Sequence, residues 1–137
     1  MKLKIINFEK GTTFLADEHA IVNDDEFCEI METASSLTYE LEGFGEHSVS
    51  QKGASKEELI KMAVKNAIFD VWFEDHMYDS FADVGLTAPI VQGKPVADID
   101  DFINNCNWIL SDDEFNRVKQ QLIDVAVKEV DMIVEDV

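Results

Sequence analysis

The chain has 137 residues, and 29 acidic residues against 11 Lys and Arg leave it a formal charge of −18. A hydrophobic content of 46% with 9% aromatics excludes an unfolded acidic tail and predicts one folded domain over residues 1–137. The shortage of bases argues against direct binding of nucleic acid or phosphorylated substrates, because Lys and Arg hold those ligands.

The acidic excess is concentrated in two stretches. From Glu9 to Glu46 there are eleven carboxylates and one base, and from Asn66 to Glu114 there are again eleven with one base. Charge of this density repels itself in the compact state, so we expect the chain to use it for contact with a basic partner. The alternative is that the acids serve only solubility.

The chain begins with extended structure. Loose alternation of apolar and polar residues predicts a strand over 2–8. Gly11 is expected to turn the chain toward a second extended piece over 12–16, and residues 20–22 are expected to add a short third strand. A small N-terminal sheet or hairpin therefore opens the predicted fold.

A first helix is predicted over about 24–36. Asn23 is a good N-cap, and apolar residues follow it at helical spacing. Beyond this helix, His47, Ser48 and Ser50 are expected in a loop, where they show no nucleophile motif.

A second, long helix is predicted to start at Ser55, which forms a capping box with Glu58. Its helical pattern continues without a proline toward Gly85. The middle of this helix, Ile68–Phe73, is apolar nearly all round, which predicts burial on two sides. That burial is expected either inside the domain or at a homodimer interface.

The last third of the chain is predicted to be helical after a loop over 86–96 that contains a short extended piece. Asp98 or Asp100 is expected to cap a short helix, and Ser111 opens a second capping box. The terminal helix that follows is expected to reach Ile133. The predicted fold class is α+β and mostly helical, with three to four helices and a small N-terminal hairpin or sheet.

The second predicted helix places acids where helices disfavour them. Asp70 and Glu74 form a like-charge pair four residues apart, and Asp75, Asp79 and Asp83 form a second file with that spacing. Each such pair costs roughly 0.2–0.5 kcal/mol. The last two acids also fall in the predicted closing turns, where the helix dipole favours cations.

Carboxylates four residues apart on a helix are spaced by about 6 Å along its axis, so two files of them can imitate the anionic track of a duplex. Violations of local rules tend to mark functional sites. The predicted partner-binding residues are Asp70, Glu74, Asp75, Asp79 and Asp83, with Asp98, Asp100 and Asp101 extending the surface.

Catalytic and metal chemistry is weakly represented. The run Asp98–Asp101 lacks the glycine and closing Glu of a calcium loop. His76 lies three residues before Asp79, but no second His or Cys is near it, which favours a surface histidine. Cys28 and Cys106 form no CxxC pair and are expected to be buried apolar residues. We therefore expect no enzymatic activity, no cofactor and no metal.

The N-terminal apolar run is too short for a signal peptide, and no stretch approaches the ~20 apolar residues of a membrane span. An intracellular, cytoplasmic protein without membrane association is therefore expected.

One segment reads Met62-Ala63-Val64-Lys65-Asn66-Ala67, followed by Val71-Trp72-Phe73, Asp75 and Gly85-Leu86. It resembles a segment of the Ocr-like antirestriction proteins, small acidic DNA mimics with which phages inhibit host restriction and CRISPR enzymes. The resemblance implies a dimeric, largely helical protein of the host cytoplasm whose acidic face occupies the DNA groove of a defence enzyme. The predicted N-terminal strands depart from that family.

The sequence thus leads to one functional hypothesis and two alternatives. The hypothesis is a non-enzymatic DNA mimic that binds the DNA-binding surface of a host restriction or CRISPR enzyme. The first alternative is an immunity protein that neutralises a basic nuclease toxin. The second is an acidic assembly module joined through the aromatics of the second helix, whose association would hardly respond to salt.

Overall fold

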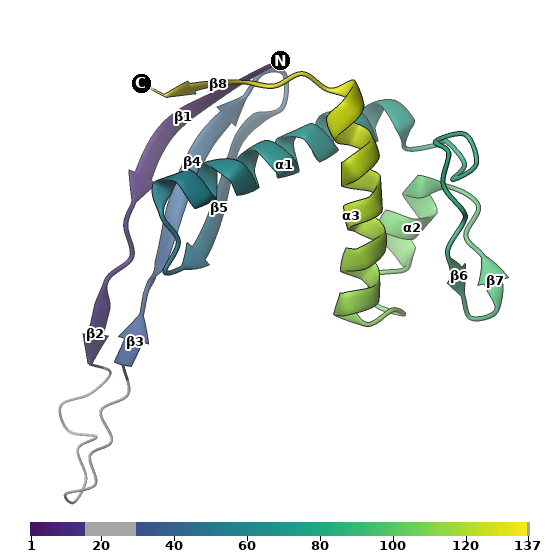
Figure 1. The fold of residues 1–137 in the computed structure, drawn as a ribbon, viewed down its shortest axis with the longest axis horizontal. Coiled ribbons are helices and arrows are strands. Elements are labelled where there is room, and N and C mark those ends of the chain that lie inside the picture. The colour runs from purple at the N-terminus through teal and green to yellow at the C-terminus, as the bar shows by residue number, and fades with distance from the viewer. Residues whose placement is uncertain (16–29, 137) are drawn as a thin grey trace, which may run out of the picture. The chain divides into compact units, whose positions relative to one another are not determined.

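The computed structural model describes residues 1–15 and 30–136 and has the predicted α+β fold (Figure 1). The strands are β1 (Lys2–Glu9), β2 (Thr13–Leu15), β3 (Ile30–Glu32), β4 (Ala34–Leu41), β5 (Gly45–Lys52), β6 (Ile90–Val91), β7 (Lys94–Pro95) and β8 (Ile133–Asp136). The helices of the described part are α1 (Lys56–His76), α2 (Ile99–Asn105) and α3 (Asp112–Glu129).

The contacts divide the chain into two compact units. Unit 1 comprises Met1–Val64 and Ile133–Val137, and unit 2 comprises Lys65–Met132. Helix α1 contributes its first half to unit 1 and its second half to unit 2. The single domain over residues 1–137 stays a prediction.

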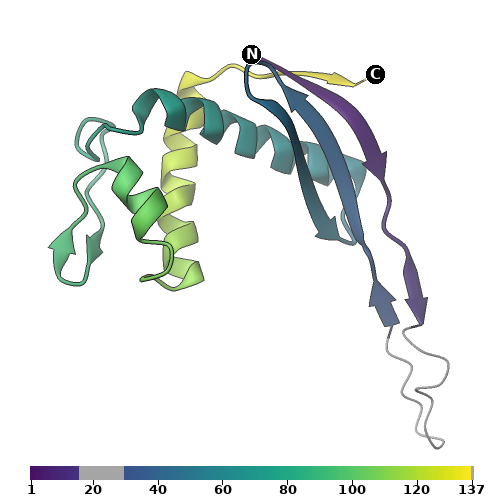
Figure 2. The ribbon, with the colours of Figure 1, turned by 180° about the vertical axis from the view of Figure 1, so that it is seen from behind.

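Unit 1 contains a mixed four-stranded sheet in the order β5-β4-β1-β8. Strand β4 pairs antiparallel with β1 and with β5, whereas β8 lies parallel to β1. The tight turn between β4 and β5 uses Gly43 and Gly45, both at positive φ, a conformation that costs glycine nothing. The first half of α1 crosses one face of this sheet (Figures 1 and 2).

The two faces of the sheet differ in chemistry. One face is apolar and buried, with side chains that include Leu3, Ile5, Leu37, Tyr39, Leu41 and Val49. The opposite face is charged: Lys4 on β1 lies between Glu40 on β4 and Glu135 on β8 in the strand register. This alternation is typical of a sheet with one face on the core and one in solvent.

The prediction of a first helix is wrong in its described part, because residues 30–32 and 34–41 are strands. From Ser35 onward, every second side chain is buried, and Ser and Thr occupy positions between them. This period of two matches the pleat of a strand, and cross-strand pairing on both sides of β4 outweighs the weaker helical spacing. Residues 24–29 and the strand expected at 20–22 lie outside the described residues.

The prediction of a loop around His47, Ser48 and Ser50 is also wrong. These residues belong to β5 and pair with Tyr39, Thr38 and Ser36 of β4. The ring of His47 stacks on Tyr39 with centroids 5.8 Å apart. The predicted strand at the N-terminus and the extension after Gly11 are confirmed as β1 and β2.

Gly11 joins β1 to β2 at a very close approach of two backbone segments. Its N–H donates to Oγ of the buried Ser35 over 2.8 Å, and the next residue, Thr12, accepts a hydrogen bond from the Thr33 N–H over 2.9 Å. A Cβ built on Gly11 would lie 2.0 Å from the carbonyl oxygen of Thr33. Only glycine fits this position without moving the backbone.

Unit 2 is built from the second half of α1, a small hairpin of β6 and β7, and helices α2 and α3. The predicted caps are confirmed: Ser55 accepts from the Glu58 N–H, and Asp98 and Ser111 cap α2 and α3. The hairpin is the short extended piece expected within residues 86–96.

Two helices end earlier than predicted. Helix α1 stops at His76 rather than near Gly85, because the next backbone groups bond to the start of α2 instead of continuing the helix. Helix α3 stops at Glu129, and Ile133 lies on β8, where its N–H donates to the carbonyl of Met1.

The apolar middle of α1 is largely buried in the core of unit 2. Ile68, Phe69 and Trp72 are buried there, and Phe69 and Trp72 contact each other through their rings. Burial inside the unit explains why this segment is apolar nearly all round. The homodimer through Ile68–Phe73 stays a prediction, for which the half-buried Val71 and Phe73 remain available.

Candidate protein-binding surface

Of the two predicted files of carboxylates, the pair Asp70 and Glu74 lies along one helix, but the file of Asp75, Asp79 and Asp83 does not. Asp70, Glu74 and Asp75 lie on α1, but Asp79 and Asp83 lie in the loop that follows it. The prediction is wrong here because the backbone of this loop finds its hydrogen-bond partners in α2. The rule that the C-terminal end of a helix disfavours acids therefore does not apply to Asp79 and Asp83.

The loop nevertheless brings acids of separate segments together. The Asp100 N–H donates to the carbonyl of Met77 over 2.8 Å, and the Ile99 N–H donates to that of Asp79 over 3.1 Å. Ser80 and Asp98 form a β-bridge beside these bonds. We call the acids of the α1 end, the loop and the α2 start the acidic surface: Glu74, Asp75, Asp79, Asp83, Asp98, Asp100 and Asp101. The eighth predicted residue, Asp70, lies one helical turn before Glu74.

Several of these carboxylates also have local structural roles. Asp98 caps α2 by accepting from the Asp101 N–H over 2.7 Å. The side chains of Asp100 and Asp101 accept from the amides of Asn104 and Asn105, at 2.5 and 3.0 Å. Acids in a first helical turn are also stabilised by the helix dipole. These interactions fix the carboxylates in place without removing their charge.

The acidic surface is not neutralised by bases. In the part of the chain that the structure describes, no Lys or Arg lies within 4.0 Å of its carboxylates. Two acids of unit 1 differ: Lys2 pairs with Glu135 at 3.5 Å, and Lys56 pairs with Asp136 at 3.0 Å.

The exception within the acidic surface is Asp79, which belongs to a cluster around His76. Nδ1 of His76 lies 2.6 Å from Oδ2 of Asp79, and Nε2 lies 3.1 Å from Oε2 of Glu129 at the end of α3. The same Glu129 oxygen accepts from Nε1 of Trp72 over 2.6 Å, and the His76 and Trp72 rings are 4.9 Å apart. Both nitrogens of His76 face carboxylates, so the ring donates to both only as a cation.

This environment raises the pKa of His76 above its ordinary value of 6.5. The hydrogen bond to Asp79 is the largest cause, opposed by burial and reinforced by the charges of Glu129, Asp79 and Asp75. The ring is 28% exposed, so it exchanges protons with solvent. His76 is therefore a structural link between α1 and α3 and not the isolated surface histidine predicted from the sequence.

We expect the free energy of unfolding to depend on pH through His76. A group whose pKa is higher in the folded state contributes stability below its unfolded pKa and loses it as the pH rises through the folded pKa. The stability of the wild type relative to His76→Gln should therefore be greatest below about pH 6.5 and fall above it. Urea unfolding of both proteins across this range measures the difference.

The matched control is His47→Gln, whose ring contacts the carbonyl of Phe44 and, in the described part of the chain, no carboxylate. An equal stability difference for His76→Gln at all pH values would contradict the role assigned to the cluster.

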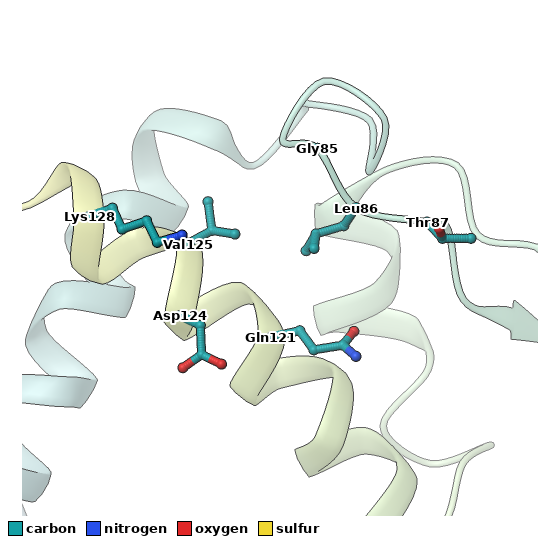
Figure 3. A pocket seen from close by; sticks show the side chains of 7 residues that line it. All are labelled: Gly85, Leu86, Thr87, Gln121, Asp124, Val125 and Lys128. Atoms are coloured by element: carbon teal, nitrogen blue, oxygen red, sulfur yellow. The ribbon is translucent and has the colours of Figure 1, made fainter.

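A pocket of 440 Å³ lies elsewhere in unit 2, between the loop at Gly85–Thr87 and helix α3 (Figure 3). Leu86 and Val125 point toward each other across it. Its other lining residues include Gln121, Asp124 and Lys128 from α3. No group of three potential metal ligands occurs among the described residues.

An exposed aromatic residue, which was not predicted from the sequence, lies beside the acidic surface. Trp108, between α2 and the cap of α3, is 80% exposed, and its Nε1 donates to the carbonyl of Asn105 over 2.5 Å. The available signal was its position just before Ser111, the predicted cap of the terminal helix. Cys106, two residues earlier, is buried as predicted, and burial raises the pKa of its thiol.

No protein-family model, curated protein or solved structure matches this chain. Within the described residues, none of the helices combines the length and the apolar character needed to cross a membrane.

Proposed function

We propose that this protein is a non-enzymatic inhibitor that binds the DNA-binding surface of a basic partner as a DNA mimic. The partner class we propose is a host restriction or CRISPR enzyme, and the protein would then act in the host cytoplasm. The observation that carries the proposal is the acidic surface, whose carboxylates come from three segments and, among the residues that the structure describes, have no Lys or Arg within 4.0 Å.

The physical argument is one of charge and fixed geometry. Proteins that grip DNA present Lys and Arg to phosphates and gain much of their affinity by neutralising that charge. Carboxylates held by helix caps and Asn side chains present negative charge in the same way, without a flexible search for partners. Steering by the net charge of −18 would speed the encounter at low salt.

The proposal predicts that uncharged analogues of the acidic surface bind the partner weakly. The triple variant Glu74→Gln, Asp75→Asn and Asp83→Asn spares the carboxylates that cap α2, accept from Asn side chains or bond to His76. Each exposed ion pair contributes up to about 1 kcal/mol, so the three changes together should weaken binding about ten- to hundredfold. Competition with a fluorescently labelled duplex on purified restriction and CRISPR enzymes measures this affinity.

The matched control is Glu40→Gln, Glu46→Gln and Glu57→Gln, which changes the net charge equally but places the changes on exposed residues of unit 1. It should retain almost all of the wild-type affinity in the same assay. Equal weakening by both triple variants would show that overall charge alone acts, and would refute a defined acidic surface.

A further inference from the structure

A groove of 260 Å³ lies in unit 2 between the β6–β7 hairpin and helix α2. Its lining is mainly apolar and consists of Val91, Pro95, Val96, Cys106 and Ile109, with Lys94, Asp101 and Asn105 as polar members. The volume falls below the range of about 300–1,000 Å³ that small-molecule sites occupy. It suits a single side chain of a protein partner better than a metabolite.

The exposed Trp108 is connected to the charged side of this groove by a chain of contacts. Asn105 donates its side-chain amide to Asp101, and its carbonyl accepts from the indole N–H of Trp108. Both hydrogen bonds hold the carboxylate and the ring beside the same residue. At 80% exposure the indole leaves its faces open, while only its N–H edge is engaged.

An exposed indole that is joined to a carboxylate through one intervening residue matches the chemistry of arginine. A guanidinium stacks on an aromatic ring and at the same time pairs with a carboxylate, and its planar fork suits both contacts. Exposed Trp and partner Arg are also the residue types that most often carry the binding energy of interfaces. The apolar groove next to them would take a neighbouring aliphatic side chain.

Lys94 on β7 lines the opposite side of the groove and would repel a cation there. The charge of the groove lining is therefore polarised, with Asp101 at the α2 side and Lys94 at the hairpin side. This arrangement places the cation of a bound segment over α2 and Trp108, and its apolar residue toward the hairpin.

We infer that the groove between the β6–β7 hairpin and α2, together with Trp108 and Asp101, docks a segment of the basic partner that carries an arginine next to an aliphatic residue. The inference rests on the proposed function for the existence of a basic partner. It adds where that partner inserts an anchor and which side chains the anchor carries.

The probe for this site is the peptide acetyl-Arg-Leu-Arg-amide, titrated into the full chain labelled with ¹⁵N. The chain contains two Trp, so its spectrum has two indole N–H signals, and Trp108→Ala assigns them. The signal of Trp108 should move with added peptide, whereas that of the buried Trp72 should stay in place. An unchanged chemical shift of the Trp72 indole also shows that Trp108→Ala is folded.

Variants on the two sides of the groove should act in opposite directions. Trp108→Ala and Asp101→Asn should each weaken peptide binding at least about threefold, and Lys94→Gln should strengthen it. Backbone amide signals report binding where the Trp108 indole is absent. Replacing Arg by Lys or Leu by Ser in the peptide should also weaken binding, because Lys lacks the planar fork and Ser the apolar anchor.

An unmoved Trp108 signal, or unchanged affinity in Trp108→Ala, would overturn the inference. So would weakening by both Asp101→Asn and Lys94→Gln. Peptide binding without displacement of DNA from any tested enzyme would support the docking groove and contradict the proposed DNA mimicry. Displacement of DNA with no peptide binding would support the DNA mimicry and contradict the docking groove.

Discussion

Trp72→Ala is expected to lower the free energy of unfolding by about 3–5 kcal/mol, the usual cost of removing a buried Trp side chain. Trp72 is 1% exposed, contacts Phe69 and His76 through its rings, and donates its N–H to Glu129. The change leaves a cavity between α1 and its neighbours and deprives Glu129 of one donor. Urea unfolding followed by far-ultraviolet circular dichroism measures the loss.

The chain supplies its own control in Trp108→Ala, which removes the same side chain from an exposed position and should change stability by less than about 0.5 kcal/mol. Trp72→Phe separates packing from hydrogen bonding, since it retains most of the ring volume but loses the N–H. It should cost less than Trp72→Ala. Equal stability of Trp72→Ala and Trp108→Ala would contradict the core assigned to unit 2.

Gly11→Ala is expected to destabilise unit 1 by about 3 kcal/mol, at the upper end of the cost of overpacking. The added Cβ would lie 2.0 Å from the Thr33 carbonyl oxygen and 2.9 Å from the Ser35 nitrogen, and both are backbone atoms that cannot rotate away. Relief requires the two backbone segments to separate, which breaks the hydrogen bond from the Gly11 N–H to Ser35. Denaturant unfolding followed through the sheet signal measures the change.

Gly43→Ala separates steric contact from backbone strain. Gly43 is at a φ of +83° with open space around its Cβ position, so the substitution carries only the cost of that conformation, about 1–2 kcal/mol. Gly11→Ala should therefore be clearly the more damaging of the two. The reverse order would mean that β1 and β4 do not approach at Gly11 as described.

Local signals predicted where helices begin better than where they end or which segments are strands. The capping residues Ser55, Asp98 and Ser111 were identified because a side chain and an N–H three residues apart form a self-contained unit. Strand β4 was missed because its pairing with β1 and β5 is non-local, and the same apolar residues also fit a helical spacing.

The candidate site shows the same limit. The excess of acids and the individual residues could be taken from the sequence. The predicted placement of these acids on one helix was wrong, because α1 ends where the loop bonds to α2. Acids four residues apart therefore reach the acidic surface from different segments. The link from His76 to Glu129 spans 53 residues, and only the folded chain brings them together.

The displacement of labelled duplex DNA from purified restriction and CRISPR enzymes by the wild-type protein tests the central claim most directly. The claim predicts that the protein releases the duplex from at least one enzyme, and that rising salt weakens its binding to that enzyme steeply, as it weakens DNA binding. Retention of the duplex by every enzyme at saturating protein, or binding to an enzyme that still holds its DNA, would contradict it.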